Sequence, residues 1–228
     1  MRRASELFTV SERAAVEKAV ADAEAKTSGE IVPVVATASG RYDRAEDLFG
    51  VLCTLVLLVI AWVFFQGVVP AEGDWEMGQR IQFGLIPVLL TVLVGFCGGT
   101  VLASLFPTLR LPFVTRGEMA AEVERAAGEA FQRFRVRGTK GKTGILIYIS
   151  LYEHMVRIMG DDELNRLVAQ SDWDAVGRAV ADAMRRGSAC DVLIEGVSRC
   201  GVILADQFPI EEGDVNELPN EVRFVDAV

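Results

Sequence analysis

Three consecutive carboxylates, Asp161, Asp162 and Glu163, are the residues of this sequence best suited to chemistry. They follow a β-rich segment and precede a helical pattern, so the backbone would present them at the end of a strand. Clustered carboxylate oxygens are the ligands that Ca²⁺ and Mg²⁺ prefer, and a bound cation would polarise a phosphate and activate water. The alternative is that these acids cap the next helix and interact favourably with its dipole.

A basic run precedes the same strand pair. It comprises Arg133, Arg135, Arg137, Lys140 and Lys142. Such a run would bind phosphate or anionic lipid headgroups, and the alternative is a solvated turn. A helix over Glu118–Arg135 would be about 27 Å long. The run would therefore reach lipid headgroups only if that helix lay nearly flat.

Other catalytic patterns are weak. Gly141-Lys142-Thr143 lacks the first glycine of a nucleotide-binding loop, because position 136 is a valine. His154 is the single imidazole and falls at a turn, and no GxSxG motif is present. The four cysteines form no CxxC pair. We therefore expect neither a zinc site nor a disulfide framework.

Two strands and a helix must position these groups. Glu30–Ala36 is a short β-rich run, and its Pro33 cannot donate to a ladder, so we expect this strand at an edge or a bulge. Thr143–Leu151 is almost continuously apolar, which indicates a strand buried on both faces. Met155–Met159 reads as the returning strand of a hairpin. The first two strands, joined through the helix that starts at Glu118, would form a right-handed parallel crossover.

The remaining sequence is predicted to be helical. A first helix begins with the capping-box pair Thr9 and Glu12, and three further helices are capped by Asp161 or Asp162, by Ser171 and by Ser188. An acidic tail would be irregular. The sequence thus predicts an α/β fold, with a small mixed sheet flanked by helices.

Two apolar runs interrupt this domain, Leu48–Val69 and Phe83–Phe106. Neither contains a charged residue, and each is long enough to cross a bilayer, which takes roughly 20 apolar residues. A short linker joins them, so they would form a transmembrane helical hairpin. The expected organisation is residues 1–47 and 107–228 as two parts of one domain, with the hairpin at 48–106.

Charges near the hairpin predict its orientation. The flanks carry Arg41, Arg44, Arg110 and Arg116, whereas the linker carries Glu72, Asp74 and Glu76 against one Arg80. Arginine and lysine near spans stay on the cytoplasmic side. Both soluble parts are therefore expected to be cytoplasmic, with the protein as a multi-pass component of a bacterial inner membrane. The net charge of −9 argues against nucleic acid as a partner.

Small residues recur at four-residue spacing in the second run. Gly95, Gly99 and Ala103 would let two helices approach closely. One interpretation is a seam between two copies of the chain. The other is packing against the first apolar helix of the same chain, or simply the high glycine content of membrane helices.

Several segments together resemble the TPM domain, the family of the thylakoid-lumen acid phosphatase and related photosystem-repair proteins. They are Ser28–Val35, Thr143–Ser150, His154–Gly160, Trp173 and the ending Phe208–Pro219. The resemblance implies a bacterial branch with two inserted spans. Some members are similar to weak acid phosphatases, and some bind calcium through a glycine-rich acidic loop. Here that place reads Gly160–Glu163, which keeps the acids and only one glycine.

Two functions follow as hypotheses. The first is a non-catalytic module that contacts other membrane proteins during their assembly or turnover, because no complete catalytic constellation is visible. The second is a metal-assisted phosphatase built on Asp161 and Asp162. Fold resemblance alone does not choose between them.

Overall fold

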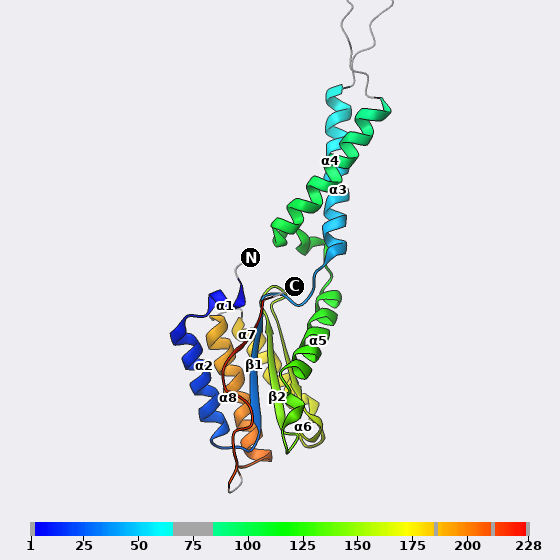
Figure 1. Ribbon diagram of the computed structural model, residues 1–228. Coiled ribbons are helices and arrows are strands. Elements are labelled where there is room, and N and C mark those ends of the chain that lie inside the picture. Colours follow the sequence, from blue (N-terminus) through cyan, green and yellow to red (C-terminus); the bar gives the residue numbers. More distant parts are fainter. Residues whose placement is uncertain (1–2, 66–83, 185–186, 211–212, 227–228) are drawn as a thin grey trace, which may run out of the picture. The chain divides into compact units, whose positions relative to one another are not determined.

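A computed structural model describes residues 3–65, 84–184, 187–210 and 213–226 (Figure 1). The chain divides into two compact units, one formed by residues 1–41 with 116–228 and the other by residues 42–115. Among the described residues, the first unit contains α1 (Ala4–Leu7), α2 (Val10–Glu24), β1 (Glu30–Ala36), α5 (Arg116–Arg133), η2 (Val136–Gly138), β2 (Gly144–Ser150), β3 (Met155–Gly160), α6 (Asp162–Leu167), α7 (Gln170–Met184), α8 (Ala189–Gln207) and β4 (Arg223–Val225). The second contains α3 (Asp43–Phe65), α4 (Leu85–Leu105) and the 3₁₀ segment η1 (Pro107–Phe113).

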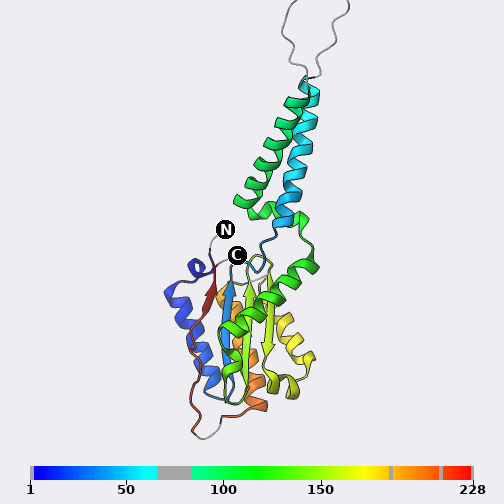
Figure 2. The same cartoon turned by 45° about the vertical axis from the view of Figure 1, so that its right-hand side comes forward.

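The first unit is built on a mixed sheet with the strand order β3-β2-β1-β4 (Figure 2). β1 and β2 run parallel, with Glu30 opposite Gly144 and Ala36 opposite Ser150. β3 returns antiparallel to β2 through a turn that includes His154. The predicted α/β class, the parallel pair of β1 and β2 and the β-hairpin of β2 and β3 are confirmed.

The edge prediction for β1 was wrong, because this strand is paired on both sides. Successive residues of a strand direct their backbone groups to alternate neighbours. The Ile31 N–H donates to Glu24 and the Thr37 N–H donates to Val225, both away from β2. Pro33 faces the same side, where pairing with β4 begins only at Val34. The missing donor is thus tolerated because β4 does not pair with β1 at Pro33.

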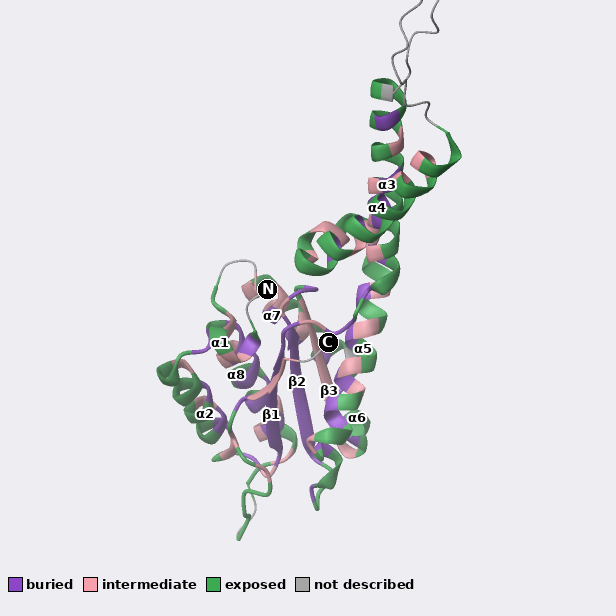
Figure 3. Cartoon of the chain, turned by 45° about the horizontal axis from the view of Figure 1, so that its top comes forward, coloured by how far each residue is buried: buried purple, intermediate pink, exposed green. Residues whose placement is uncertain are grey.

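Side-chain alternation divides the core between the two faces of the sheet. Figure 3 shows β1 and β2 buried along their length. One face packs against α2, α7 and α8 through Ile31, Val35, Ile145, Ile147 and Ile149. The other packs against α5 through Val32, Val34, Ala36, Leu146 and Tyr148. The continuous apolar character of β2 arises because both of its faces are covered.

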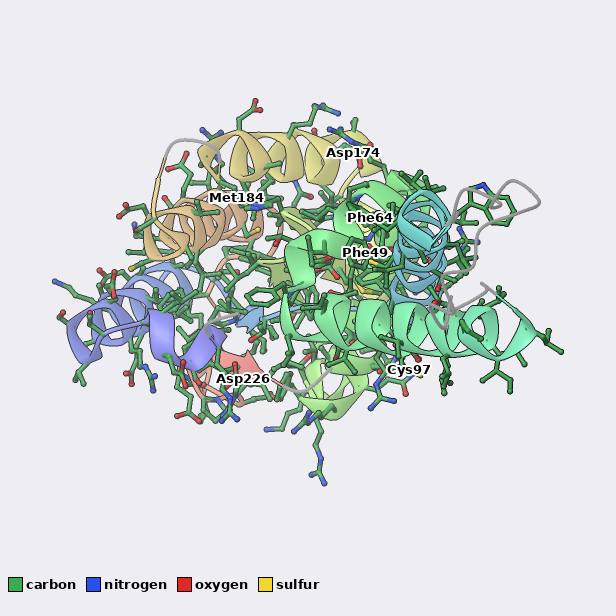
Figure 4. The ribbon with its side chains drawn as sticks, turned by 90° about the horizontal axis from the view of Figure 1, so that it is seen from above. Phe49, Phe64, Cys97, Asp174, Met184 and Asp226 are labelled. Atoms are coloured by element: carbon green, nitrogen blue, oxygen red, sulfur yellow. The ribbon has the colours of Figure 1, made fainter. Side chains whose placement is uncertain are left out.

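The acidic tail is more ordered than predicted. Residues 223–225 form β4, parallel to β1, so the expectation of an irregular tail was wrong there. Asp226, labelled in Figure 4, accepts hydrogen bonds from the hydroxyls of Ser5 and Thr37. Further back, the Glu30 carboxylate accepts the N–H groups of Glu217 and Leu218. Side-chain carboxylates therefore fix the tail at both ends of β1.

Helix caps follow the sequence closely. Thr9 and Glu12 form the predicted capping box, and Ser188 accepts from the Asp191 N–H at the start of α8. Ser171 was expected to cap α7, but that helix already begins at Gln170. The crossover helix ends at Arg133 rather than Arg135, because Arg135 adopts a left-handed conformation with φ of 56°.

The second unit is a pair of apolar helices. Residues 66–69 and 83 of the predicted spans, and the linker acids, lie outside the described residues. α3 and α4 pack where Gly95 and Gly99 are buried against Thr54 and Gly50. The small residues of α4 thus contact α3 of the same chain, as in the packing interpretation. A seam between two copies at these positions stays a prediction, and it would require α3 to move away.

The unit extends beyond the predicted limits of 48 and 106. Arg110 of η1 forms an ion pair with Glu46 of α3, at 2.7 Å between Nη2 and Oε1. Its guanidinium also donates to the carbonyls of Ala103 and Ser104 at the end of α4. The rings of Phe49 and Phe113 meet edge to face. These contacts tie the charged first turn of α3 and the segment after α4 to the hairpin.

Candidate functional site

The three carboxylates at the end of β3 occupy different environments. Asp161 is buried, and its side chain caps α6 by accepting the Asp162 N–H at 2.7 Å. Arg137 lies beside both aspartates, with nitrogen–oxygen distances of 3.5 Å to Asp161 and 3.1 Å to Asp162. Glu163 instead pairs with Arg166 at 2.7 Å. The capping alternative is therefore confirmed for Asp161.

The metal interpretation keeps one supporting observation. The Oδ2 atom of Asp161 is buried and accepts no hydrogen bond within the described residues. Against the metal interpretation, no group of three or more metal-binding side chains gathers anywhere among the described residues. A Ca²⁺ or Mg²⁺ site at Asp161, Asp162 and Glu163 stays a prediction.

The basic run does not form one surface. Arg137 faces the aspartates, Lys140 lines a cavity at the amino ends of β1 and β2, and Arg133 lines a groove beside α5. Arg135 and Lys142 both have positive φ angles, which turn the chain sharply between α5 and β2. The five residues therefore do not converge on a single anion-binding site.

The cavity at the amino ends of the strands has a volume of about 480 Å³ and is lined by both acidic and basic side chains. Its side chains include Glu30, Lys140, Asp214 and Glu217. Burial raises the pKa of Glu30, although the two tail N–H groups that it accepts oppose this shift. Burial likewise raises the pKa of nearby Glu24 to about 7. Glu30 holds the tail and Glu24 holds the start of the strand, so the contacts of both carboxyl groups give them a structural role.

A buried polar network lies at the opposite ends of the strands, and sequence reasoning missed it. Glu153, in the turn after β2, accepts the N–H of Ser39 at 2.9 Å and the N–H of Gly40 at 3.3 Å. The Ser39 hydroxyl lies 2.7 Å from that of Ser150 and 3.1 Å from that of Tyr148. Burial raises the pKa of Tyr148. The network closes the carboxyl ends of the parallel strands, where α/β folds commonly bind ligands.

A groove of about 290 Å³ adjoins this network. Arg41, Arg125 and Arg133 line it together with Glu129 and Tyr148. Its remaining lining residues are Ala38, Ser39, Ala126, Ala130 and Val225. The arrangement presents cationic groups over a floor that is part polar and part apolar. Guanidinium groups are suited to pairing with carboxylate or phosphate oxygens, and no exposed nucleophile lies beside a base among these lining residues.

Comparisons with known proteins bear on the fold. No family model matches the chain, and no curated protein matches it. The chain is similar to the NMR structure of the BA42 protein from the psychrophilic bacterium Bizionia argentinensis, with a TM-score of 0.56 and 21% identity. The match covers 98% of this chain and 99% of that one. At this identity the likeness establishes the α/β fold alone, and the TPM resemblance stays an expectation.

Proposed function

We propose that this protein is a membrane-anchored accessory module that contacts other membrane proteins and does not itself catalyse a reaction. The observation that carries the proposal is the exposure of apolar side chains on α3 and α4. Both helices are long and apolar enough to cross a membrane, yet only 11% of the most apolar stretch of each helix is buried. Val63 and Leu85, for example, are 66% and 73% exposed. Water disfavours such surfaces, whereas lipid tails accept them.

The carboxylates at the end of β3 favour a module over a phosphatase. Asp161 caps α6, and Arg137 already supplies positive charge to Asp161 and Asp162. A divalent cation would have to compete with that guanidinium. A metal-assisted phosphatase is the second candidate, supported by the unpartnered Oδ2 of Asp161 and by the TPM resemblance.

Phosphomonoester hydrolysis distinguishes the two candidates. The full-length protein in detergent is assayed on p-nitrophenyl phosphate with Mg²⁺, Mn²⁺ or Ca²⁺, beside Asp162→Asn. Asp172→Asn is the matched control, because Asp172 also lies in the first turn of a helix. If the chain is a non-catalytic module, neither the wild type nor either variant should show metal-dependent turnover. Metal-dependent turnover that is lost only in Asp162→Asn would establish the phosphatase instead.

A further inference from the structure

Among the described residues, a single helix, α5, covers one face of the sheet, and the groove lies beside it. α5 contacts β2 and β3, whereas α2, α7 and α8 cover the other face (Figure 2). Within the part of the chain that the structure describes, no second helix covers the side of β1 and β4 next to α5. Ala38 and Val225 line this space from the ends of β1 and β4, and Ala126 and Ala130 line it from α5.

Positive charge is concentrated in the groove although the whole chain carries a net charge of −9. Three arginines and one glutamate line it. The Arg133 guanidinium lies 5.6 Å from the centre of the Phe134 ring and forms no ion pair within the described residues. Arg223 of β4 approaches the same ring at 5.9 Å. The cationic lining thus continues onto the neighbouring strand.

The arginines are distributed along the groove rather than directed at one point. Arg125, Glu129 and Arg133 lie four residues apart on α5, so Arg125 and Arg133 are separated by about 12 Å along the helix axis. Arg125 is held by Glu122, by Glu129 and by the Ser39 carbonyl. A single small oxyanion would need converging donors. Separated cations over a partly apolar floor suit an extended segment with several acidic side chains.

We infer that the groove binds a short acidic peptide segment of a partner protein. Acidic side chains of the peptide pair with Arg41 and Arg133, while its aliphatic carbons contact Ala126, Ala130 and Val225. This inference rests on the proposed function, because it specifies which surface of the module receives a partner. Charge complementarity, rather than apolar burial, would supply most of the selectivity.

Fluorescence anisotropy of a labelled peptide tests the inference. The probes are the hexapeptide GDEDEG and its neutral counterpart GNQNQG, added to the full-length protein in detergent at low ionic strength. GDEDEG should bind at least about fivefold more tightly than GNQNQG, since each exposed charge pair contributes up to about 1 kcal/mol. Added salt should remove this preference.

Arg133→Gln should weaken GDEDEG binding about threefold to fivefold. Arg199→Gln is the matched control, because Arg199 is exposed on α8, which packs on the opposite face of the sheet, and it should leave binding unchanged. Arg133 is exposed, and an unchanged melting temperature would show that the variant is folded. Equal affinity for both peptides, or equal weakening by Arg199→Gln, would overturn the inference. So would saturable binding of inorganic phosphate that depends on Arg133 and displaces the peptide.

The hydrolysis assay does not use this groove. If the protein stays in the membrane, hydrolyses nothing and does not bind the peptide at this site, only this inference is overturned. Metal-dependent hydrolysis in a protein that still binds GDEDEG through Arg133 would overturn the proposed function and retain the site.

Discussion

Gly99 of α4 lies directly against Gly50 of α3. A Cβ atom added at position 99 would stand 2.7 Å from the Gly50 Cα and 2.9 Å from the Cys53 Cβ. One turn earlier, a Cβ at Gly95 would stand 2.7 Å from the Thr54 Cα. Both contacts involve backbone or Cβ atoms, which no side-chain rotation can relieve. The two apolar helices therefore depend on glycine for their close approach.

Gly99→Ile should force α3 and α4 apart and lower the melting temperature of the hairpin in detergent. Gly98→Ile is the matched control, because a Cβ at Gly98 meets no atom within 4 Å. Thermal unfolding followed by circular dichroism measures both. Equal stability of the two variants would show that the close contact does not hold the hairpin.

The pKa of Glu24 makes stability depend on pH. Burial raises this pKa from 4.5 to about 7. The folded chain therefore holds a proton that the unfolded chain has lost between these values, so the contribution of Glu24 to stability falls as pH rises from about 4.5 to 7. Glu24→Gln removes the charge and can still accept the Ile31 N–H. We expect it to be more stable than the wild type by about 1–2 kcal/mol at pH 8, after allowance for solvent screening.

Urea unfolding at pH 5 and pH 8 tests this expectation. The advantage of Glu24→Gln should shrink towards zero at pH 5, where the native carboxyl is mostly protonated. A difference that stayed constant with pH would mean that folding does not raise the pKa of Glu24. Glu17→Gln, on the exposed face of the same helix, is the control and should show no such change.

Glu30→Ala should release the tail from β1. The Glu217 N–H would lose its acceptor, which lies at 2.8 Å in the wild type, whereas the Leu218 N–H would keep the Asn216 Oδ1 atom at 3.1 Å. Hydrogen exchange of the Glu217 amide should accelerate at least about tenfold, while amides of β2 stay protected. Unchanged exchange at Glu217 would show that other contacts hold the tail.

Glu153→Ala should destabilise the first unit by about 2–4 kcal/mol, because it leaves the buried N–H groups of Ser39 and Gly40 without their acceptor. Fluorescence of buried Trp173 reports the urea transition. Glu129→Ala, at an exposed position, should cost less than about 1 kcal/mol. Similar losses in both variants would indicate that the network contributes little.

Local patterns predicted much of the fold. The apolar run through Ile145, Ile147 and Ile149 identified the central strand, and Thr9 with Glu12 marked the start of α2. These signals depend on neighbouring residues and were readable without tertiary information. The position of β1 was misjudged because the effect of Pro33 depends on where β4 begins, nearly 200 residues later in the chain.

The polar network and the arginine groove could not be predicted. Ser39 and Glu153 are 114 residues apart, and only the parallel register of β1 with β2 brings them together. Arg41 likewise lies far in sequence from Arg125 and Arg133, which share α5. The basic run was visible as a cluster in sequence, yet the turn at Arg135 directs its members to separate surfaces.

Anchoring of the chain in a membrane can be measured directly. Membranes are extracted with alkaline carbonate, and intact cells are labelled with a membrane-impermeant maleimide on Gly73→Cys and Asp206→Cys, with the unmodified chain as the blank. If the chain is anchored as proposed, the protein stays in the membrane, Gly73→Cys is labelled and Asp206→Cys is not. Release of the protein by carbonate, or labelling of Asp206→Cys alone, would contradict this proposal.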